Sequence, residues 1–276
     1  MKIIDGKGIA AQLRAELKEK IDACEEKPGL AVVIVGEDPA SRIYVRNKIK
    51  ACGEIGIRSY SYELPENSTQ KQVEDLLDEL GNNPEIHGIL LQMPLPKHLD
   101  GESAAAHIPF EKDVDGFSAQ NLGLLMQNRA QVAACTPLGV MKLLEREGIE
   151  LTGKHAVILG RSETVGKPMA MLLLNANATV TVCHSKTKNL KEQCLNADIL
   201  ISAVGKAGFV TEDIVKEGAV VIDVGINRDQ EGKVCGDVDF ERVKEKTSYI
   251  TPVPGGVGPM TITMLMYNTY LRFQNR

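Results

Sequence analysis

A glycine turn in the second half of the chain is a candidate for binding phosphate. The run His155 to Leu159 is apolar and strand-like, and Gly160, Arg161 and Ser162 follow it directly. A strand, a tight turn and a helix in that order point backbone N–H groups and the positive end of a helix dipole at one spot, which suits a dinucleotide pyrophosphate. The match to G-x-G-x-x-G is poor, because Ser162 and Val165 replace its second and third glycines. An ordinary strand-to-helix turn is the alternative.

The residues after the next strand bear on the choice of cofactor. Thr179 to Cys183 alternates and is rich in β-branched residues, which predicts a strand beside the first one. An NAD site usually carries an acidic residue about 20 residues beyond the turn, and none is found there. Ser185, Lys186 and Lys188 instead join Arg161 in offering donors for a 2′-phosphate. The sequence predicts an NADP site, and a solvated basic loop is the alternative.

The first half of the chain offers residues for proton transfer. Tyr44 and Lys48 are four apart on a predicted helix, so they share one face, although a surface Tyr/Lys pair is the plainer interpretation. A lysine becomes a useful acid or base when burial or its neighbours destabilise the ammonium. Gln92 ends an apolar strand, at the rim where open α/β sheets bind ligands.

Two carboxylates lie close together in Lys112-Asp-Val-Asp-Gly-Phe117. Asp113 and Asp115 are candidates for metal ligands, for ring-binding carboxylates or for turn residues, and the turn interpretation leads on sequence alone. We expect no metal, because no histidine or further carboxylate is spaced to complete a ligand shell.

The first half of the chain, which carries Tyr44, Lys48 and Gln92, is predicted to alternate between strands and helices. Apolar runs at Leu30–Val35, Ile57–Leu64 and Ile86–Met93 predict strands. Asp38-Pro39 and the capping box Thr69-x-x-Gln72 predict the starts of two intervening helices. This order predicts a parallel sheet covered on both faces. Residues 97–134 carry few regular signals and predict a long connection.

The second half predicts a small doubly wound dinucleotide fold. Thr136-Pro137 is expected to cap a helix that ends near Gly148, where we place the domain boundary. Further strands are expected at Ile199–Val204 and Ala219–Gly225. The Pro/Gly-rich run 251–258 leads into a last helix, which we expect to return to the first domain.

The composition excludes several classes of protein. The chain has 276 residues, 43% hydrophobic and 25% charged, with a formal charge of −5, which is typical of a globular protein. Without a basic surplus, and with only 4% aromatic residues, it lacks the usual features of a nucleic-acid binder. We expect no membrane segment and a cytoplasmic protein, because no apolar run reaches signal-peptide or membrane-spanning length. Six scattered cysteines without a C-x-x-C pair are expected to be reduced.

Seven ordered motifs spread over nearly the whole chain carry a resemblance to one family. They resemble the bifunctional methylenetetrahydrofolate dehydrogenase/methenyltetrahydrofolate cyclohydrolases. The motifs are Tyr44-Val-x-x-Lys48, Gly88-Ile-Leu-Leu-Gln-Met-Pro-Leu-Pro96, Lys112-Asp-Val-Asp-Gly116, Cys135-Thr-Pro-x-Gly139, Gly160-Arg-Ser162, Cys183-His-Ser185 and Pro252-Val-Pro-Gly-Gly-Val-Gly-Pro-Met-Thr261.

The resemblance implies an α/β enzyme of two domains. Residues 1–137 plus 258–276 would form a parallel α/β catalytic domain that binds folate, and residues 138–257 a Rossmann-like NADP domain, with the folate cleft between them. NADP-dependent oxidation of 5,10-methylenetetrahydrofolate would be followed by hydrolysis to 10-formyltetrahydrofolate, in a homodimer.

The resemblance also assigns site residues. Lys48, Tyr44 and Gln92 would be catalytic, with Gln92 orienting Lys48 or polarising the developing oxygen. The substrate-binding residues would be Asp115, Tyr44, Gly256 and Pro259. The cofactor-binding residues would be Gly160, Arg161, Ser162, Ser185 and Ile226.

Other functions remain open at the level of sequence. A dehydrogenase without cyclohydrolase activity would keep the fold, but Tyr44, Lys48 and Gln92 are all present. A non-catalytic NADPH-binding module is a second alternative, and a dehydrogenase of an unrelated small substrate is a third.

Overall fold

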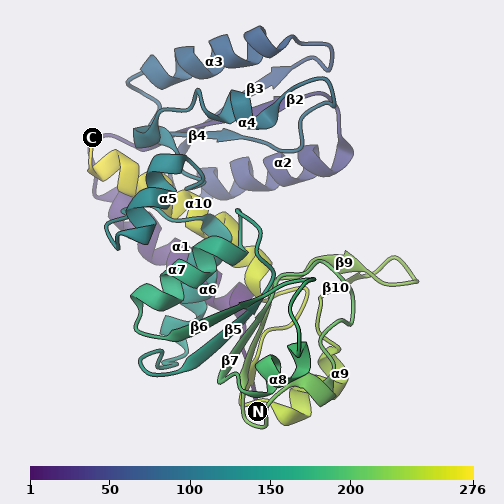
Figure 1. The fold of residues 1–276 in the computed structure, drawn as a ribbon. Helices are drawn as coiled ribbons and strands as arrows, with labels where there is room; N and C mark the ends of the chain where they lie inside the picture. Colours follow the sequence, from purple (N-terminus) through teal and green to yellow (C-terminus); the bar gives the residue numbers. More distant parts are fainter. The chain divides into compact units, whose positions relative to one another are not determined.

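The structure is a computed structural model that describes residues 1–39 and 41–276. The chain forms two compact units (Figure 1). The three-stranded unit comprises Gln12–Leu124, Arg129–Ala133 and Leu265–Arg276. The six-stranded unit comprises Met1–Ala11, Leu125–Asn128 and Ala134–Met264.

Helices and strands alternate through most of both units. The α-helices are α1 (Gly6–Asp22), α2 (Pro39–Glu54), α3 (Gln70–Asn82), α4 (Gly101–Ala105), α5 (Ala119–Met126), α6 (Cys135–Arg146), α7 (Gly166–Asn175), α8 (Leu190–Leu195), α9 (Phe240–Val243) and α10 (Val257–Gln274). The strands are β1 (Lys2–Ile3), β2 (Gly29–Val35), β3 (Arg58–Leu64), β4 (Gly88–Leu91), β5 (His155–Leu159), β6 (Thr179–Cys183), β7 (Ile199–Ser202), β8 (Val220–Asp223), β9 (Asn227–Arg228), β10 (Val234–Cys235) and β11 (Tyr249–Ile250). Short 3₁₀ turns cover Phe110–Lys112, Glu212–Ile214 and Lys244–Lys246.

The three-stranded unit is built around β2, which pairs in parallel with β3 on one side and β4 on the other. Every residue of β2 is buried, as expected of a central strand covered on both faces. Val73, Leu77 and Leu80 of α3 pack on one face of the sheet, and α2 covers the opposite face (Figure 1). The predicted strand–helix–strand–helix–strand series is confirmed.

Two helix starts in this unit are set by local hydrogen bonds, as predicted. The Ser41 N–H donates to Asp38 Oδ2 at 2.7 Å at the start of α2. Thr69 and Gln72 form both halves of the capping box of α3. Past the other end of α2, Gly56 has a φ of +85°, a conformation that favours glycine.

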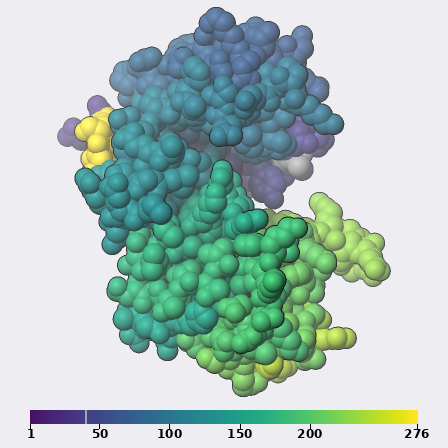
Figure 2. Space-filling view, in the orientation of Figure 1, coloured from purple at the N-terminus to yellow at the C-terminus, as the bar shows by residue number. Residues whose placement is uncertain are grey.

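The six-stranded unit has a fully parallel main sheet in the order β1-β11-β8-β7-β5-β6. α8 and α9 cover one face, and α6 and α7 lie on the other (Figure 1). β5 is followed in sequence by β6 on one side and then by β7 on the other. That reversal is the topological switch point at which doubly wound sheets bind ligands. The small antiparallel hairpin β9–β10 projects from this unit as a yellow-green arm (Figure 2).

The C-terminal helix belongs to both units along the chain. α10 starts in the six-stranded unit, and its second half, from Leu265, belongs to the three-stranded unit with residues 12–124. The expected return of the last helix is confirmed. The assignment of residues 1–137 plus 258–276 to folate and 138–257 to NADP stays a prediction.

The expected cap at Thr136 is wrong. α6 begins at Cys135 after Ala134, which gives no side-chain cap, so Thr136 lies inside the helix. Its hydroxyl pairs instead with the Thr261 hydroxyl of α10 at 2.9 Å. Thr136 therefore links α6 to α10 and does not cap α6.

The connection over residues 97–134 contains more regular structure than predicted. α4, a 3₁₀ turn and α5 occupy parts of it. Asp100 begins α4 by accepting the N–H groups of Glu102 and Ser103, each at 3.0 Å. The five residues of α4 are too few to show helical periodicity, which explains the miss.

Candidate functional site

Lys48 and Gln92 meet in the three-stranded unit. The Lys48 ammonium, half-buried on α2, donates a hydrogen bond to Gln92 Oε1 at 3.0 Å. The Gln92 side-chain N–H donates in turn to the Met93 carbonyl at 2.6 Å. Because its NH₂ is engaged there, the amide presents its oxygen to Lys48. The β-strand rim and the middle of α2 are thereby linked by one charged hydrogen bond.

Tyr44 lies one turn before Lys48 but does not bond to it. The residue is 46% exposed, and its hydroxyl has no hydrogen-bond partner among residues 1–39 and 41–276. Other large apolar side chains near the predicted residues in sequence are also exposed: Ile43, Met93 and Phe117. These groups offer apolar surface of the kind that a flat ring system packs against.

Asp115 lies within the electrostatic reach of Lys48. Burial raises the pKa of Asp115 to about 6, the Lys48 charge opposes that rise, and the neighbouring Asp113 charge adds to it. The carboxyl is therefore ionised at neutral pH and titrates just below it. An ionised carboxylate accepts hydrogen bonds only, which suits a ligand with N–H donors.

Asp113 is a turn residue, which is the interpretation that the sequence favours. Its carboxylate accepts the backbone N–H groups of Gly116 and Ser118, both at 2.8 Å. It also accepts the side-chain amide of Asn121 at 2.7 Å. This carboxylate is buried and fixes the bend that carries Asp115.

Two residues of α10 support the same bend and were missed in the sequence. The fully buried Asn268 donates to the carbonyls of Val114 and Ala133, each at 2.9 Å. Arg272 donates to the Asn121 side-chain oxygen at 2.9 Å. The only signal in the sequence is a polar pair within an apolar helix, and it does not reveal partners about 150 residues away.

The glycine turn of the six-stranded unit is confirmed as strand, turn and helix. Gly160 follows β5 with a φ of +120°, and an added Cβ would clash with the Ala203 carbonyl on the next loop. Gly166, the first residue of α7, packs equally closely on Gly160 and Arg161. The motif comparison missed Gly166 because it falls outside the G-x-G-x-x-G spacing. The Ser162 hydroxyl accepts the N–H groups of Val165 and Gly166, which closes the turn.

The side chains that are predicted to bind phosphate lie beyond the carboxyl ends of two neighbouring strands. β5 and β6 are paired so that Leu159 lies opposite Cys183, which places Arg161 and Ser185 just beyond two adjacent strand ends. Arg161, Ser185, Lys186 and Lys188 are exposed. The Arg161 guanidinium makes no hydrogen bond or ion pair with any residue that the structure describes, so its donors face solvent.

His184 shapes the turn beside these residues. Its N–H donates to the Thr187 hydroxyl at 2.8 Å, and its Nδ1 accepts the Lys186 N–H at 3.1 Å. Nδ1 as an acceptor places the proton of a neutral ring on Nε2.

The remaining predicted residues also lie in the six-stranded unit. Ile226 is 59% exposed just before β9. Gly256 packs against Pro252 and Thr251, where an added Cβ would come within 2.6 Å of the Pro252 carbonyl oxygen. Pro259 lies in the first turn of α10, where a missing N–H is tolerated. The predicted residues thus form two groups, one in each unit.

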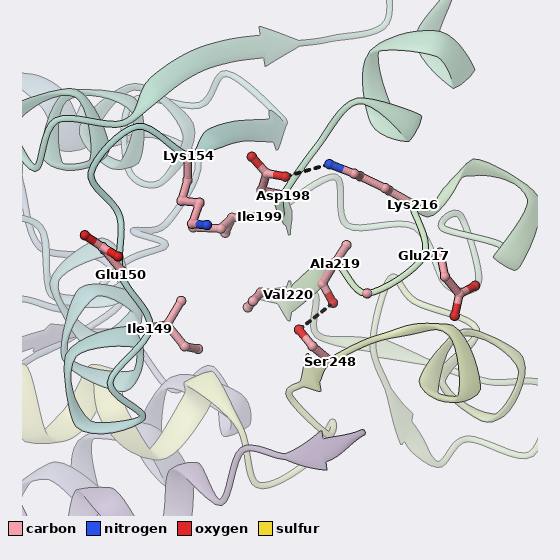
Figure 3. Close-up of a pocket in the computed structure, with 11 residues that line it drawn as sticks. Ile149, Glu150, Lys154, Asp198, Ile199, Lys216, Glu217, Ala219, Val220 and Ser248 are labelled. Carbon is pink, nitrogen blue, oxygen red and sulfur yellow. Dashed lines mark hydrogen bonds and ion pairs between the residues drawn. The ribbon is translucent and has the colours of Figure 1, made fainter.

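A surface pocket in the six-stranded unit lies at the other end of the sheet from Gly160. It measures about 230 Å³ and is lined by Lys154, Asp198, Lys216 and Ser248 among others (Figure 3). Asp198 and Lys216 form an ion pair there at 2.6 Å. Lys154 precedes β5 and Gly160 follows it, so the length of a five-residue strand, about 16 Å, separates the two ends. This pocket is not part of the predicted site.

The structure gives two further findings about the described residues. No helix among them is both long and apolar enough to span a bilayer. All six cysteines are free.

Two family models together match most of the chain. Residues 4–115 match the catalytic domain of tetrahydrofolate dehydrogenase/cyclohydrolase. Residues 134–276 match the NAD(P)-binding domain of tetrahydrofolate dehydrogenase/cyclohydrolase.

Individual relatives agree with these domain models over nearly full length. The bifunctional protein FolD of Nitrosospira multiformis is 57% identical over 271 residues, which cover 97% of this chain and 94% of that protein. The crystal structure of the FolD dehydrogenase/cyclohydrolase from Campylobacter jejuni is 50% identical, with a TM-score of 0.98 over 100% of this chain and 99% of the other. The Trypanosoma brucei FolD structure, complexed with NADP cofactor and inhibitor, is 40% identical, with a TM-score of 0.93 over 99% and 97%. The chain belongs to the tetrahydrofolate dehydrogenase/cyclohydrolase family.

Proposed function

We propose that this chain is a bifunctional enzyme of one-carbon metabolism. It oxidises 5,10-methylenetetrahydrofolate to 5,10-methenyltetrahydrofolate with NADP, and it hydrolyses that product to 10-formyltetrahydrofolate. The hydrogen bond between Lys48 and Gln92, within reach of Asp115, is the observation that carries this proposal. Lys48 supplies a proton-transfer group and Asp115 a carboxylate. The two parts of the chain match a catalytic and an NAD(P)-binding domain.

The folate side is assigned to residues 1–137 plus 258–276. Asp115 accepts N–H donors of the pterin ring, and the exposed Tyr44 ring packs on the folate. Pro259 belongs to these residues and Gly256 directly precedes them in the chain; both contribute through close approach of the backbone, because neither places a bulky polar side chain against the substrate.

The NADP side is assigned to residues 138–257. The turn of Gly160 and Ser162 offers backbone N–H groups and a helix N-terminus to the pyrophosphate. The exposed Arg161 and Ser185 donors fit a 2′-phosphate, and Ile226 packs on the cofactor. When bound, NADP supplies the acceptor for the hydride that leaves the methylene carbon. The protein contributes positioning to this step, because oxidation to the delocalised methenyl cation needs no acid or base.

The hydrolytic step needs proton transfer. Water adds to the methenyl carbon and loses a proton, and one C–N bond then opens while the released nitrogen takes up a proton. We assign these transfers to Lys48 Nζ. Gln92 holds that amine in place through its Oε1 and adds no charge to the site.

Assays of each half-reaction test the proposal. With methylenetetrahydrofolate and NADP, we expect reduced cofactor and the ultraviolet absorbance of the methenyl compound. With methenyltetrahydrofolate alone, we expect enzymatic formation of the 10-formyl product. Oxidation without hydrolysis would leave a monofunctional dehydrogenase, and NADP binding without either reaction would leave a binding module.

We further propose a cytoplasmic homodimer. β6 is an edge strand of the main sheet, and Val182 on it is 37% exposed, which gives a second copy an apolar edge to cover. Light scattering coupled to gel filtration should give twice the mass of the chain, and a monomer at assay concentration would contradict the dimer.

A further inference from the structure

A fully buried carboxylate lies outside both groups of predicted site residues. Asp237 follows β10 and has no exposed surface. It forms no ion pair with a lysine, arginine or histidine that the structure describes, so hydrogen bonds alone satisfy its two oxygens. A buried carboxyl group is costly unless it is hydrogen-bonded, so its burial implies a demanding arrangement of donors.

Five donors converge on Asp237, four from residues 202–206 and one from Asn227. Oδ2 accepts the Ser202 hydroxyl at 3.0 Å, the Val204 N–H at 2.8 Å and the Gly205 N–H at 3.3 Å. Oδ1 accepts the Lys206 N–H and the Asn227 side-chain amide, each at 2.9 Å. Three consecutive backbone N–H groups thus wrap the carboxylate as a nest wraps an anion. The loop after β7 takes its shape from this one side chain.

Asp223 anchors Asp237 from the end of β8. It is also buried, and its carboxylate accepts the N–H groups of Gly225, Asp237 and Val238 at 2.8 to 3.0 Å. Gly225 must be a glycine here, since an added Cβ would come within 2.7 Å of the Asp237 nitrogen. The backbone of Asp237 is therefore fixed as firmly as its side chain.

The loop that Asp237 shapes touches the glycine turn. The Ala203 N–H donates to the Leu159 carbonyl at 2.8 Å, and Gly160 has no room for a Cβ against Ala203. The residues after β5 and β7 flank the switch point of the sheet, where a dinucleotide lies in such folds. Asn227, which donates to Asp237 from a separate part of the chain, directly follows the exposed Ile226.

We propose that Asp237 is a positioning residue for NADP: it holds the loop 203–206 and the Ile226–Asn227 segment in the form that the cofactor requires. This inference rests on the proposed function. It adds that cofactor binding depends on a carboxylate buried beneath the surface that binds the cofactor. Hydrolysis of the methenyl substrate, which uses no cofactor, does not depend on Asp237.

The variant Asp237→Asn keeps the shape of the side chain and removes its charge. In the wild type, each carboxylate oxygen accepts at least one backbone N–H group of the loop. The amide of asparagine replaces one of these oxygens by an NH₂ group, whichever way it is oriented. At least one backbone N–H group of the loop therefore loses its acceptor. A buried unsatisfied donor costs about 1–3 kcal/mol, or roughly 5- to 150-fold in an equilibrium. We expect the NADP dissociation constant, measured by calorimetry, to rise at least about fivefold. Amide exchange at residues 204–206 of the cofactor-free protein should accelerate by a similar factor.

Asp198→Asn is the matched control. Asp198 belongs to the same unit, pairs with Lys216, and accepts the His155 N–H at 2.9 Å at the amino end of the sheet. We expect it to lower the melting temperature without changing NADP affinity. Asn227→Ala removes one donor to Asp237 and should weaken NADP binding in the same direction by less, which keeps the test possible if Asp237→Asn does not fold.

The outcomes separate the two proposals. Wild-type protein that binds no NADP in calorimetry would remove the proposed function before any variant is compared. If wild type binds NADP but Asp237→Asn binds it within about twofold of wild type, the positioning role is wrong. Equal weakening by Asp198→Asn, or a proportional loss of methenyl hydrolysis in Asp237→Asn, would also overturn it, because each would indicate general destabilisation.

Discussion

Replacing Lys48 by alanine separates the two reactions. Alanine is the best helix former, so α2 should persist. The change removes one hydrogen bond, from Lys48 to Gln92 Oε1, and we expect it to cost about 1 kcal/mol of unfolding free energy. That is small against a typical stability of about 5–15 kcal/mol, so any large loss of activity has a chemical cause.

The expected magnitude follows from the role of the amine. General acid–base catalysis contributes about 10²- to 10⁴-fold, and we expect hydrolysis of methenyltetrahydrofolate by Lys48→Ala to slow by that factor. Oxidation of the methylene substrate needs no proton transfer, so its kcat should stay within about tenfold of wild type. The variant should therefore release methenyl product that wild type converts further.

A side effect at Asp115 sets the assay conditions. The Lys48 charge lowers the pKa of Asp115, so its removal lets that pKa rise above about 6. We would assay at about pH 7.5 or higher and subtract uncatalysed hydrolysis, so that the carboxylate stays largely ionised. NADP affinity should be unchanged.

Lys50→Ala is the matched control for Lys48→Ala. Lys50 lies on the same helix, is exposed, and has no hydrogen-bond or ion-pair partner among the described residues. Both reactions should proceed normally in this variant. Near-normal formation of the 10-formyl product by Lys48→Ala, or equal losses in both variants, would refute the assignment of proton transfer to Lys48.

Three further predictions address the cofactor turn and the folate carboxylate. Arg161→Ala should raise the KM for NADP and leave that for NAD unchanged, since the guanidinium is assigned to the 2′-phosphate; steady-state kinetics with both cofactors checks this, and equal effects would contradict it. Gly160→Ala should weaken NADP binding and lower the melting temperature, because the positive φ and the Ala203 carbonyl leave no room for a Cβ; unchanged calorimetric and thermal values would count against the turn. The KM for methylenetetrahydrofolate should rise as pH falls through about 6, because protonation of Asp115 removes a hydrogen-bond acceptor and adds a donor. The KM of Asp115→Asn should not show this rise in the same pH range. A rise that persists in the variant would be due to another titrating group and would contradict the prediction.

Local signals in the sequence predicted much of the fold. The Asp38 cap and the Thr69 to Gln72 capping box are each decided within a few residues, so the sequence pattern predicted them. β6 was predicted with its observed bounds, because an alternating β-branched run between turns has few other solutions.

Features set by distant contacts were not predicted. β1 and β11 are two residues each and are strands only because β11 pairs with β1 on one side and with β8 on the other. Thr136 looked like a cap because its alternative partner, Thr261, is 125 residues away. Strand ends were overestimated for the same reason, since Met93 and Val204 continue an apolar run but lack a ladder partner.

The candidate site likewise combines features that local sequence patterns predict with features that depend on distant contacts. Spacing placed Tyr44 and Lys48 on one helix face, but only the structure brought Gln92 to the Lys48 amine. The supports of Asp115 and of the loop after β7 come from α10 and from Asp237, at separations that no periodicity encodes. A polar side chain in an apolar helix, such as Asn268, needs hydrogen-bond partners, and here they lie more than a hundred residues away.

Deuterium transfer tests the central claim most directly. Methylenetetrahydrofolate carrying two deuterium atoms on the bridging carbon would be incubated with the wild-type protein and NADP, and the products analysed by mass spectrometry. We predict one deuterium in the reduced nicotinamide and the other retained on the carbon of 10-formyltetrahydrofolate, in equal amounts. Label lost to solvent, or labelled NADPH formed without labelled 10-formyl product beyond the uncatalysed rate, would contradict a single protein that performs both the oxidation and the hydrolysis.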